Sequence, residues 1–145
     1  MSSLVVDTCV IRLYDLPLDP AYAELFKWID EEGILYVNKK LVGEYISTGN
    51  RQVSILLQKL TKDSKKKRLI DIKKSEIERF DLDRNFRYTC NFEDQYHSKT
   101  VFLSPNKKLI TQDKKLLGDV NRFKKVAGKK PEAVIRPKKD FYANP

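Results

Sequence analysis

Short apolar runs, rich in branched side chains, recur along the chain and are typical of buried strands. The first run, residues 4–6, ends abruptly at Asp7. Because these runs are too short for ordinary helices and are separated by polar or turn-forming residues, we interpret each of them as a strand. The runs assigned in this way cover residues 4–6, 34–37, 69–72, 108–111 and 133–135.

Between these runs, apolar residues recur at the three- and four-residue spacing of amphipathic helices. Asp19 before Pro20 predicts the start of one helix, which Gly33 ends, and Asn38 predicts the cap of the next. Strands that alternate with helices predict an α/β fold, a three-layer α/β/α sandwich around a mostly parallel sheet of about five strands. Further helices are predicted over residues 51–61, from about Ser75 with Glu78 as its capping partner, over residues 93–103 and after Asp113.

The length of 145 residues is that of one domain. We expect residues 1–136 to form this domain and residues 137–145 to form a loose C-terminal tail. Asp7 interrupts the apolar stretch nearest the N-terminus, and the apolar runs fall far short of the roughly 20 residues that span a membrane. Cys9 and Cys90 lack C-x-x-C spacing and are typical of buried thiols in a reducing cytosol. We therefore expect a cytoplasmic protein without a membrane partner.

The chain carries a formal net charge of +9, which is unevenly distributed. Residues 1–60 contain 6 Lys and Arg against 8 Asp and Glu, whereas residues 61–145 contain 23 against 12. A basic half indicates a polyanionic partner, nucleic acid above all; the alternative is a solvated surface that only confers solubility. A run of four basic residues in a predicted loop is open to the same two interpretations, RNA binding or solvation: Lys65, Lys66, Lys67 and Arg68.

Four acidic residues are predicted to meet at one edge of the sheet. Asp7 and Asp113 follow strands, Glu44 lies early in the helix after the second strand, and Asp94 lies near the start of a helix. Like charges in one cleft repel, so a hard divalent cation would stabilise them, and carboxylate oxygens suit Mg²⁺ or Mn²⁺. Such an ion can polarise a phosphoryl oxygen and lower the pKa of a bound water. The alternative is that these acids are ordinary helix caps.

The segments that carry these acids resemble those of PIN-domain ribonucleases, in order and spacing. Residues 4–11 (LVVDTCVI) are similar to the opening strand of that family, and residues 41–46 (LVGEYI) to its helix with a glutamate. Residues 94–97 (DQYH) resemble the helix start that supplies a third acid, and residues 108–117 (KLITQDKKLL) resemble the late strand with Thr-x-Asp. The resemblance covers nearly the whole chain, although each motif is short.

This resemblance implies a metal-dependent endoribonuclease that cleaves RNA phosphodiester bonds with bound Mg²⁺ or Mn²⁺. The implied metal ligands and catalytic carboxylates are Asp7, Glu44, Asp94 and Asp113. Many small members of the family resemble VapC-type toxins, which implies the toxin of a toxin-antitoxin pair. The expected partners are then RNA, an antitoxin or another regulatory protein, and a second copy of the chain in a homodimer.

The chain departs from the family pattern at two places. The helix that begins near Asp94 lacks an alanine-rich continuation, which leaves Glu93 as a competing third acid. A second acid in the helix after Asp113 is not obvious, and Asp119 is the candidate.

Other residues could support the site. His97 lies three residues after Asp94, on the same helix face, where it could contact phosphate or hydrogen-bond a ligand carboxylate. Thr8 and Thr111 could orient metal-bound water, and Arg12 could bind phosphate; helix capping and simple solvation are their alternative roles.

Two other classes of protein are compatible with parts of the pattern. A non-catalytic RNA-binding or scaffold module could keep this fold and its basic surface. A phosphoacceptor receiver domain would need an acidic pair after the first strand and an aspartate after the third, but Asp7 stands alone and Lys73 follows the third strand. A dinucleotide-binding domain is excluded because no G-x-G-x-x-G motif is present.

Overall fold

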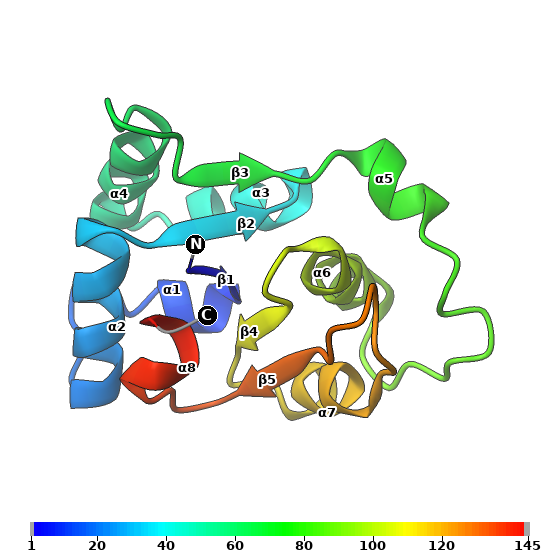
Figure 1. The fold of residues 1–145 in the computed structure, drawn as a ribbon. Coiled ribbons are helices and arrows are strands. Elements are labelled where there is room, and N and C mark those ends of the chain that lie inside the picture. The colour runs from blue at the N-terminus through cyan, green and yellow to red at the C-terminus, as the bar shows by residue number, and fades with distance from the viewer. Residues whose placement is uncertain (1, 144–145) are drawn as a thin grey trace.

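A computed structural model describes residues 2–143, which form one sheet of five parallel strands and eight helices (Figure 1). The strand order in the sheet is β3-β2-β1-β4-β5. This confirms the predicted α/β fold, and every strand forms within one residue of its expected run. The strands are β1 (Ser3–Val6), β2 (Ile34–Val37), β3 (Leu69–Asp71), β4 (Lys108–Ile110) and β5 (Glu132–Val134).

Helices cover both faces of the sheet. Figure 1 shows α1, α2, α4 and α8 on one side and α5, α6 and α7 on the other, and α3 packs against α1 and α4. The three layers follow because each crossover between parallel strands must lay its helix on a face of the sheet. The helices are α1 (Thr8–Ile11), α2 (Pro20–Glu31), α3 (Lys39–Ser47), α4 (Arg51–Thr61), α5 (Lys74–Arg79), α6 (Phe92–Leu103), α7 (Lys114–Arg122) and α8 (Lys139–Ala143).

β1 and β4 lie side by side, although more than a hundred residues separate them in sequence. Val5 pairs with Leu109 and Val6 with Ile110, and the Asp7 amide donates to the Ile110 carbonyl at 3.0 Å. The connections after these two strands leave toward opposite faces, so this pair is the topological switch point of the sheet. Ligands of parallel α/β sheets bind at such a point, beyond the carboxyl ends of the strands.

Side-chain caps start most of the helices, as the sequence predicts. The Asp19 carboxylate accepts from the Ala21 amide at 2.9 Å, and Asn38 accepts from Leu41 at 2.8 Å. α5 differs from these helices. It starts after Lys73, without a side-chain cap, so the capping box expected at its start does not form.

Gly33 ends α2 through close packing. A Cβ atom at this position would lie 2.7 Å from the Trp28 ring, nearer than such contacts allow. Any other residue here would force the Trp28 ring and the Ile29 backbone to shift.

The expectation of a loose C-terminal tail is wrong for the part that the structure describes. α8 packs against α2, and Tyr142 is buried with its ring centroid 4.9 Å from that of Trp28. Lys108 of β4 donates to the Phe141 carbonyl at 2.6 Å. Residues 144–145 of the expected tail lie outside the described residues.

Arg68 fits neither interpretation of the basic run, RNA binding or solvation. Arg68 is only 2% exposed, and its guanidinium donates to the carbonyls of Ile29, Asp30 and Gly33 at 2.6 to 3.2 Å. It also pairs with Asp63 at 2.6 Å. The last carbonyls of a helix lack partners within the helix, so Arg68 acts as a cap for the end of α2.

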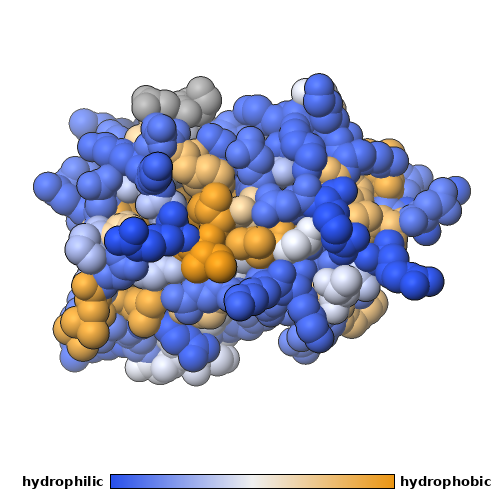
Figure 2. All heavy atoms as spheres, turned by 90° about the horizontal axis from the view of Figure 1, so that it is seen from below, coloured by the Kyte–Doolittle hydropathy of each residue, from blue (hydrophilic) through white to orange (hydrophobic). Residues whose placement is uncertain are grey.

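The surface is largely hydrophilic. Figure 2 shows one face, seen from below, on which hydrophilic atoms predominate and hydrophobic atoms form a patch near the middle. Among the described residues, no helix is both long and apolar enough to cross a membrane.

We predict that Arg68→Met lowers the free energy of unfolding by about 2–4 kcal/mol, because buried carbonyls and the Asp63 carboxylate lose their donor. Urea unfolding followed by circular dichroism measures this change. Lys67→Met is the matched control, since Lys67 is exposed, and it should stay within roughly 0.5 kcal/mol of wild type. Equal stability of both variants would show that Arg68 is not a structural cap.

Candidate functional site

The four predicted acids come from four different elements that converge at the switch point. Asp7 follows β1 and caps α1, Asp113 caps α7 beyond β4, Glu44 lies in α3, and Asp94 lies in the first turn of α6. The charges of the other three all act on Asp94, which places the four in one electrostatic cluster.

Asp7 is held at the floor of this cluster by three donors. It is 9% exposed. Its Oδ1 accepts from the Thr8 amide at 2.8 Å, and its Oδ2 accepts from the Thr111 hydroxyl at 2.7 Å and the Cys9 thiol at 3.3 Å. Burial and the charge of Asp7 raise the pKa of the Cys9 thiol, so it stays a neutral donor. The orientation of Asp7 is therefore fixed by the local fold.

Thr111 connects Asp7 with Asp113. While its hydroxyl donates to Asp7, its Oγ1 accepts from the Asp113 amide at 3.0 Å. The Asp113 carboxylate in turn accepts from the Lys115 and Leu116 amides with a single oxygen, Oδ1, at 2.9 and 3.2 Å. Asp113 is thus a helix cap whose second carboxylate oxygen can still bind a ligand.

Glu44 is oriented by donors on both of its oxygens. The Thr8 hydroxyl donates to Oε1, and His97 Nε2 lies 2.8 Å from Oε2. Burial alone would raise the pKa of Glu44, but the hydrogen bonds from His97 and the Thr8 hydroxyl, together with the charge of Lys40, lower it below its ordinary value. Glu44 is therefore ionised at neutral pH.

Asn38 determines which nitrogen of His97 carries the proton. Its Oδ1 accepts from the Leu41 amide, so its Nδ2 must be the group that lies 3.2 Å from His97 Nδ1. Since Nδ2 is a donor, Nδ1 accepts and Nε2–H donates to Glu44. His97 is thus a buried group that positions Glu44, as the sequence suggested, and it is only 1% exposed.

Asp94 differs from the other three acids because its carboxylate has no hydrogen-bonding partner among residues 2–143. Burial, together with the charges of Asp7, Asp113 and Glu44 and against the effect of His97, raises its pKa to about 6. Glu93, the competing candidate, is exposed on the rim of the site. The geometry therefore favours Asp94 as the third member of the cluster.

The chemical type of these ligand atoms suits a hard divalent ion. All four groups offer carboxylate oxygens, and Asp94 has an unpartnered, half-buried carboxylate that a cation would stabilise. Within the described part of the chain, no three acidic, histidine or cysteine side chains stand close enough to enclose a metal by themselves. Mg²⁺ usually keeps several waters and takes only one or two carboxylates directly, so an enclosed set is not required.

An open hollow of about 550 Å³ lies beside the cluster. Arg12, Lys40, Glu44 and Glu93 are among the residues that line it. Arg12 is thus near the acids, as the sequence suggested. Lys40 was not predicted, although its four-residue spacing from Glu44 places both on one face of α3 and was a usable signal.

Asp119 and the lysine loop are not part of this site. Asp119 is fully buried, and both of its oxygens accept from the amides of Thr89 and Cys90 at 2.9 to 3.0 Å. Burial would raise its pKa, but these hydrogen bonds hold the pKa below its ordinary value. Asp119 hydrogen-bonds the loop before α6 to α7. The assignment of Asp119 as a further acid of the site is therefore wrong.

The three exposed lysines of the expected RNA-binding run, residues 65–67, precede β3. They therefore lie at the amino edge of the parallel sheet, opposite the edge where Asp7 and Asp113 meet.

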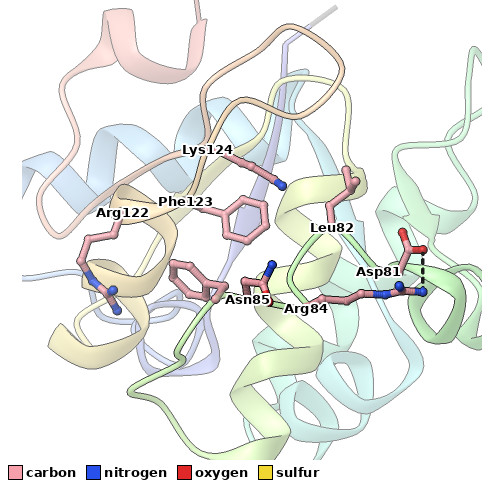
Figure 3. Close-up of a pocket in the computed structure, with 8 residues that line it drawn as sticks. Asp81, Leu82, Arg84, Asn85, Arg122, Phe123 and Lys124 are labelled. Atoms are coloured by element: carbon pink, nitrogen blue, oxygen red, sulfur yellow. Dashed lines mark ion pairs between the residues drawn. The ribbon is translucent and has the colours of Figure 1, made fainter.

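A separate hollow of about 500 Å³ lies between the loop after α5 and the end of α7 (Figure 3). Figure 3 shows Lys124 extending into it, while Arg84 and Arg122 are paired with carboxylates at 3.6 and 2.6 Å. Phe123, on its wall, is the C-cap of α7, ten residues after Asp113, which puts it about 15 Å from Asp113 along the helix. The hollow is distinct from the acidic site.

Comparison of the chain with known protein families, with curated proteins and with solved structures finds no match.

We predict that Asp94→Asn stabilises the protein in EDTA, and that the difference in stability between the variant and wild type depends on pH. In the unfolded chain this carboxyl has a pKa of 3.8, and in the fold its pKa is about 6. The folded protein thus binds this proton more tightly than the unfolded chain does. Protonated Asp94 therefore stabilises the wild-type fold below about pH 4, and this stabilisation is lost as pH rises through 6. Above that pH, the free energy of unfolding of Asp94→Asn should be about 1 kcal/mol higher than that of wild type.

Thermal unfolding at a series of pH values measures this gap, which should shrink as pH falls from about 6 toward 4. Glu93→Gln is the control, because Glu93 is exposed. A stability gap for Asp94→Asn that is absent or independent of pH would mean that Asp94 is not held among the other carboxylates.

Proposed function

We propose that this protein is an endoribonuclease that depends on Mg²⁺ or Mn²⁺. The observation that carries the proposal is the convergence of Asp7, Glu44, Asp94 and Asp113 at the switch point of a parallel sheet, where the Asp94 carboxylate has no hydrogen-bonding partner in the described part of the chain. The net charge of +9 supports a polyanionic substrate. The same four residues carry the resemblance to PIN-domain ribonucleases.

The residues of this chain would divide the work as follows. Asp7, Asp94 and Asp113 would hold the ion, and Glu44 would bind it or its water. A bound divalent ion supplies Lewis-acid stabilisation of a phosphoryl oxygen and a more acidic bound water.

The neighbouring groups would keep these carboxylates in place. Thr111 and Thr8 fix Asp7 and Glu44, and His97 holds the Glu44 carboxylate through Nε2–H. Arg12 and Lys40 would bind the RNA phosphates beside the acids.

A cytoplasmic toxin held inactive by an antitoxin is the finer form of this proposal. Exposed apolar side chains in the α1–α2 connection and α3 support a regulatory protein partner: Leu16, Leu18 and Ile46 are 67%, 86% and 58% exposed. Asn50, the N-cap of α4, holds the α1–α2 connection by donating to Asp15 and to the Arg12 carbonyl.

We expect RNA cleavage to require Mg²⁺ or Mn²⁺ and to stop in EDTA. Asp113→Asn should reduce the cleavage rate by roughly a hundredfold or more, because it removes a ligand charge, while asparagine preserves the helix cap. A fluorogenic RNA assay with a titration of Mn²⁺ measures both effects.

Asp19→Asn is the matched control, since Asp19 also caps a helix but pairs with Arg136 away from the acids. It should cleave at the wild-type rate. RNA binding by the wild type without any metal-dependent cleavage would instead favour the non-catalytic RNA-binding module.

A further inference from the structure

The hollow of Figure 3 has walls from two segments that lie far apart in sequence, residues 81–86 and residues 122–124. Phe86, from the first segment, packs edge to face on Phe123, from the second, with ring centroids 5.0 Å apart. Phe123 stacks in turn on Phe102 at 4.0 Å, and both of these rings are buried. The walls are therefore anchored to the hydrophobic core, which gives the hollow the preformed character of a ligand site.

Two side chains in this hollow have donors that are not in use. Figure 3 shows the ends of Lys124 and Asn85 directed toward the space between Phe123 and Leu82. Both side chains are exposed, and among residues 2–143 neither has a hydrogen-bonding or ion-pairing partner. Leu82 is 46% exposed and belongs to the apolar wall. An ammonium, an amide and an apolar wall thus face one space of about 500 Å³, which is the size of a small-molecule site.

The charge around the hollow favours an anionic ligand. Residues 79–88 and 122–130 contain eight Lys and Arg against two Asp. Arg122 is already paired with Asp119 at 2.6 Å, but Arg84 lies 3.6 Å from Asp81 in a pair whose side chains are 80% and 63% exposed. Exposed pairs of this kind contribute little to stability and exchange readily. Arg84 and Lys124 are therefore available to an anion.

We propose that this hollow binds a nucleoside phosphate, with the base against the apolar wall and the phosphate on Lys124 and Arg84. The Asn85 amide can both donate to and accept from the polar edge of a base. A phosphate group carries nearly two negative charges at neutral pH, and a carboxylate carries one, so a surface this basic favours a phosphate. This site is separate from the acids, and the proposal does not depend on the nuclease function.

The site is tested by fluorescence titration of the full chain, in EDTA, with the N-methylanthraniloyl derivatives of ADP and GDP. At least one of the two should bind saturably, and the unlabelled nucleotide should displace it. The corresponding nucleoside and pyrophosphate should each compete roughly tenfold less well, because each offers only one half of the contacts.

Three variants locate the binding. Lys124→Gln should weaken it by roughly tenfold, through loss of a charged donor to the phosphate. Asn85→Ala should weaken it by roughly two- to tenfold, through loss of the amide. Lys125→Gln is the matched control, because Lys125 is exposed and adjacent in sequence but does not line the hollow. It should stay within about twofold of wild type, as a surface charge outside the site.

Four results would each overturn the proposal. They are the absence of saturable binding of both nucleotides, equal effects of Lys124→Gln and Lys125→Gln, and displacement by pyrophosphate or by a polyglutamate peptide as effective as by the nucleotide. The last two would assign the hollow to a bare anion or to an acidic protein segment. Melting temperatures of the variants exclude loss of folding. Because the assay contains neither metal nor RNA, its result is independent of whether the acids cleave RNA.

Discussion

The parallel pairing of β1 with β4 is the constraint on which the whole site depends. Val6 lies beside Ile110, so the chain leaves both strands at the same height, and Asp7 and Thr111 meet there through a hydrogen bond. The crossovers then depart toward opposite faces. α3, which carries Glu44, and α6, which carries Asp94, can therefore approach the carboxyl ends of β1 and β4.

The fold resolves the repulsion among these acids unevenly. Asp7, Glu44 and Asp113 are each stabilised by donors that the local structure supplies, such as helix amides, threonine hydroxyls and His97. Asp94 receives none from residues 2–143, and its pKa rises to about 6. A structure that satisfies three carboxylates and leaves the fourth unpaired among them is well suited to a cation, because a cation stabilises all four together.

Much of this arrangement could be predicted from local patterns. An acid just after a buried strand has its position determined by a few neighbouring residues, which is why Asp7 and Asp113 were found. Glu44 was found from the helix that Asn38 caps, in whose second turn it lies. The choice between Glu93 and Asp94 depends on the rotation of α6, which the Asn91 cap sets.

Other roles depended on partners far away in the sequence. Arg68 binds carbonyls 35 to 39 residues away, and Asp119 binds amides 29 to 30 residues away. Tyr142 packs on Trp28 from the other end of the chain. No local pattern specifies such contacts, so Arg68, Asp119 and the C-terminal tail were each assigned the wrong role.

Direct binding of Mn²⁺ to the RNA-free protein tests the central claim most simply. Electron paramagnetic resonance of free Mn²⁺ at neutral pH gives the dissociation constant for wild type, Asp94→Asn and Glu93→Gln. We predict saturable binding by wild type and Glu93→Gln, and binding weaker by roughly tenfold or more in Asp94→Asn, which loses a ligand charge. Wild-type protein that binds no Mn²⁺, or Asp94→Asn that binds it as tightly as wild type, would contradict the account.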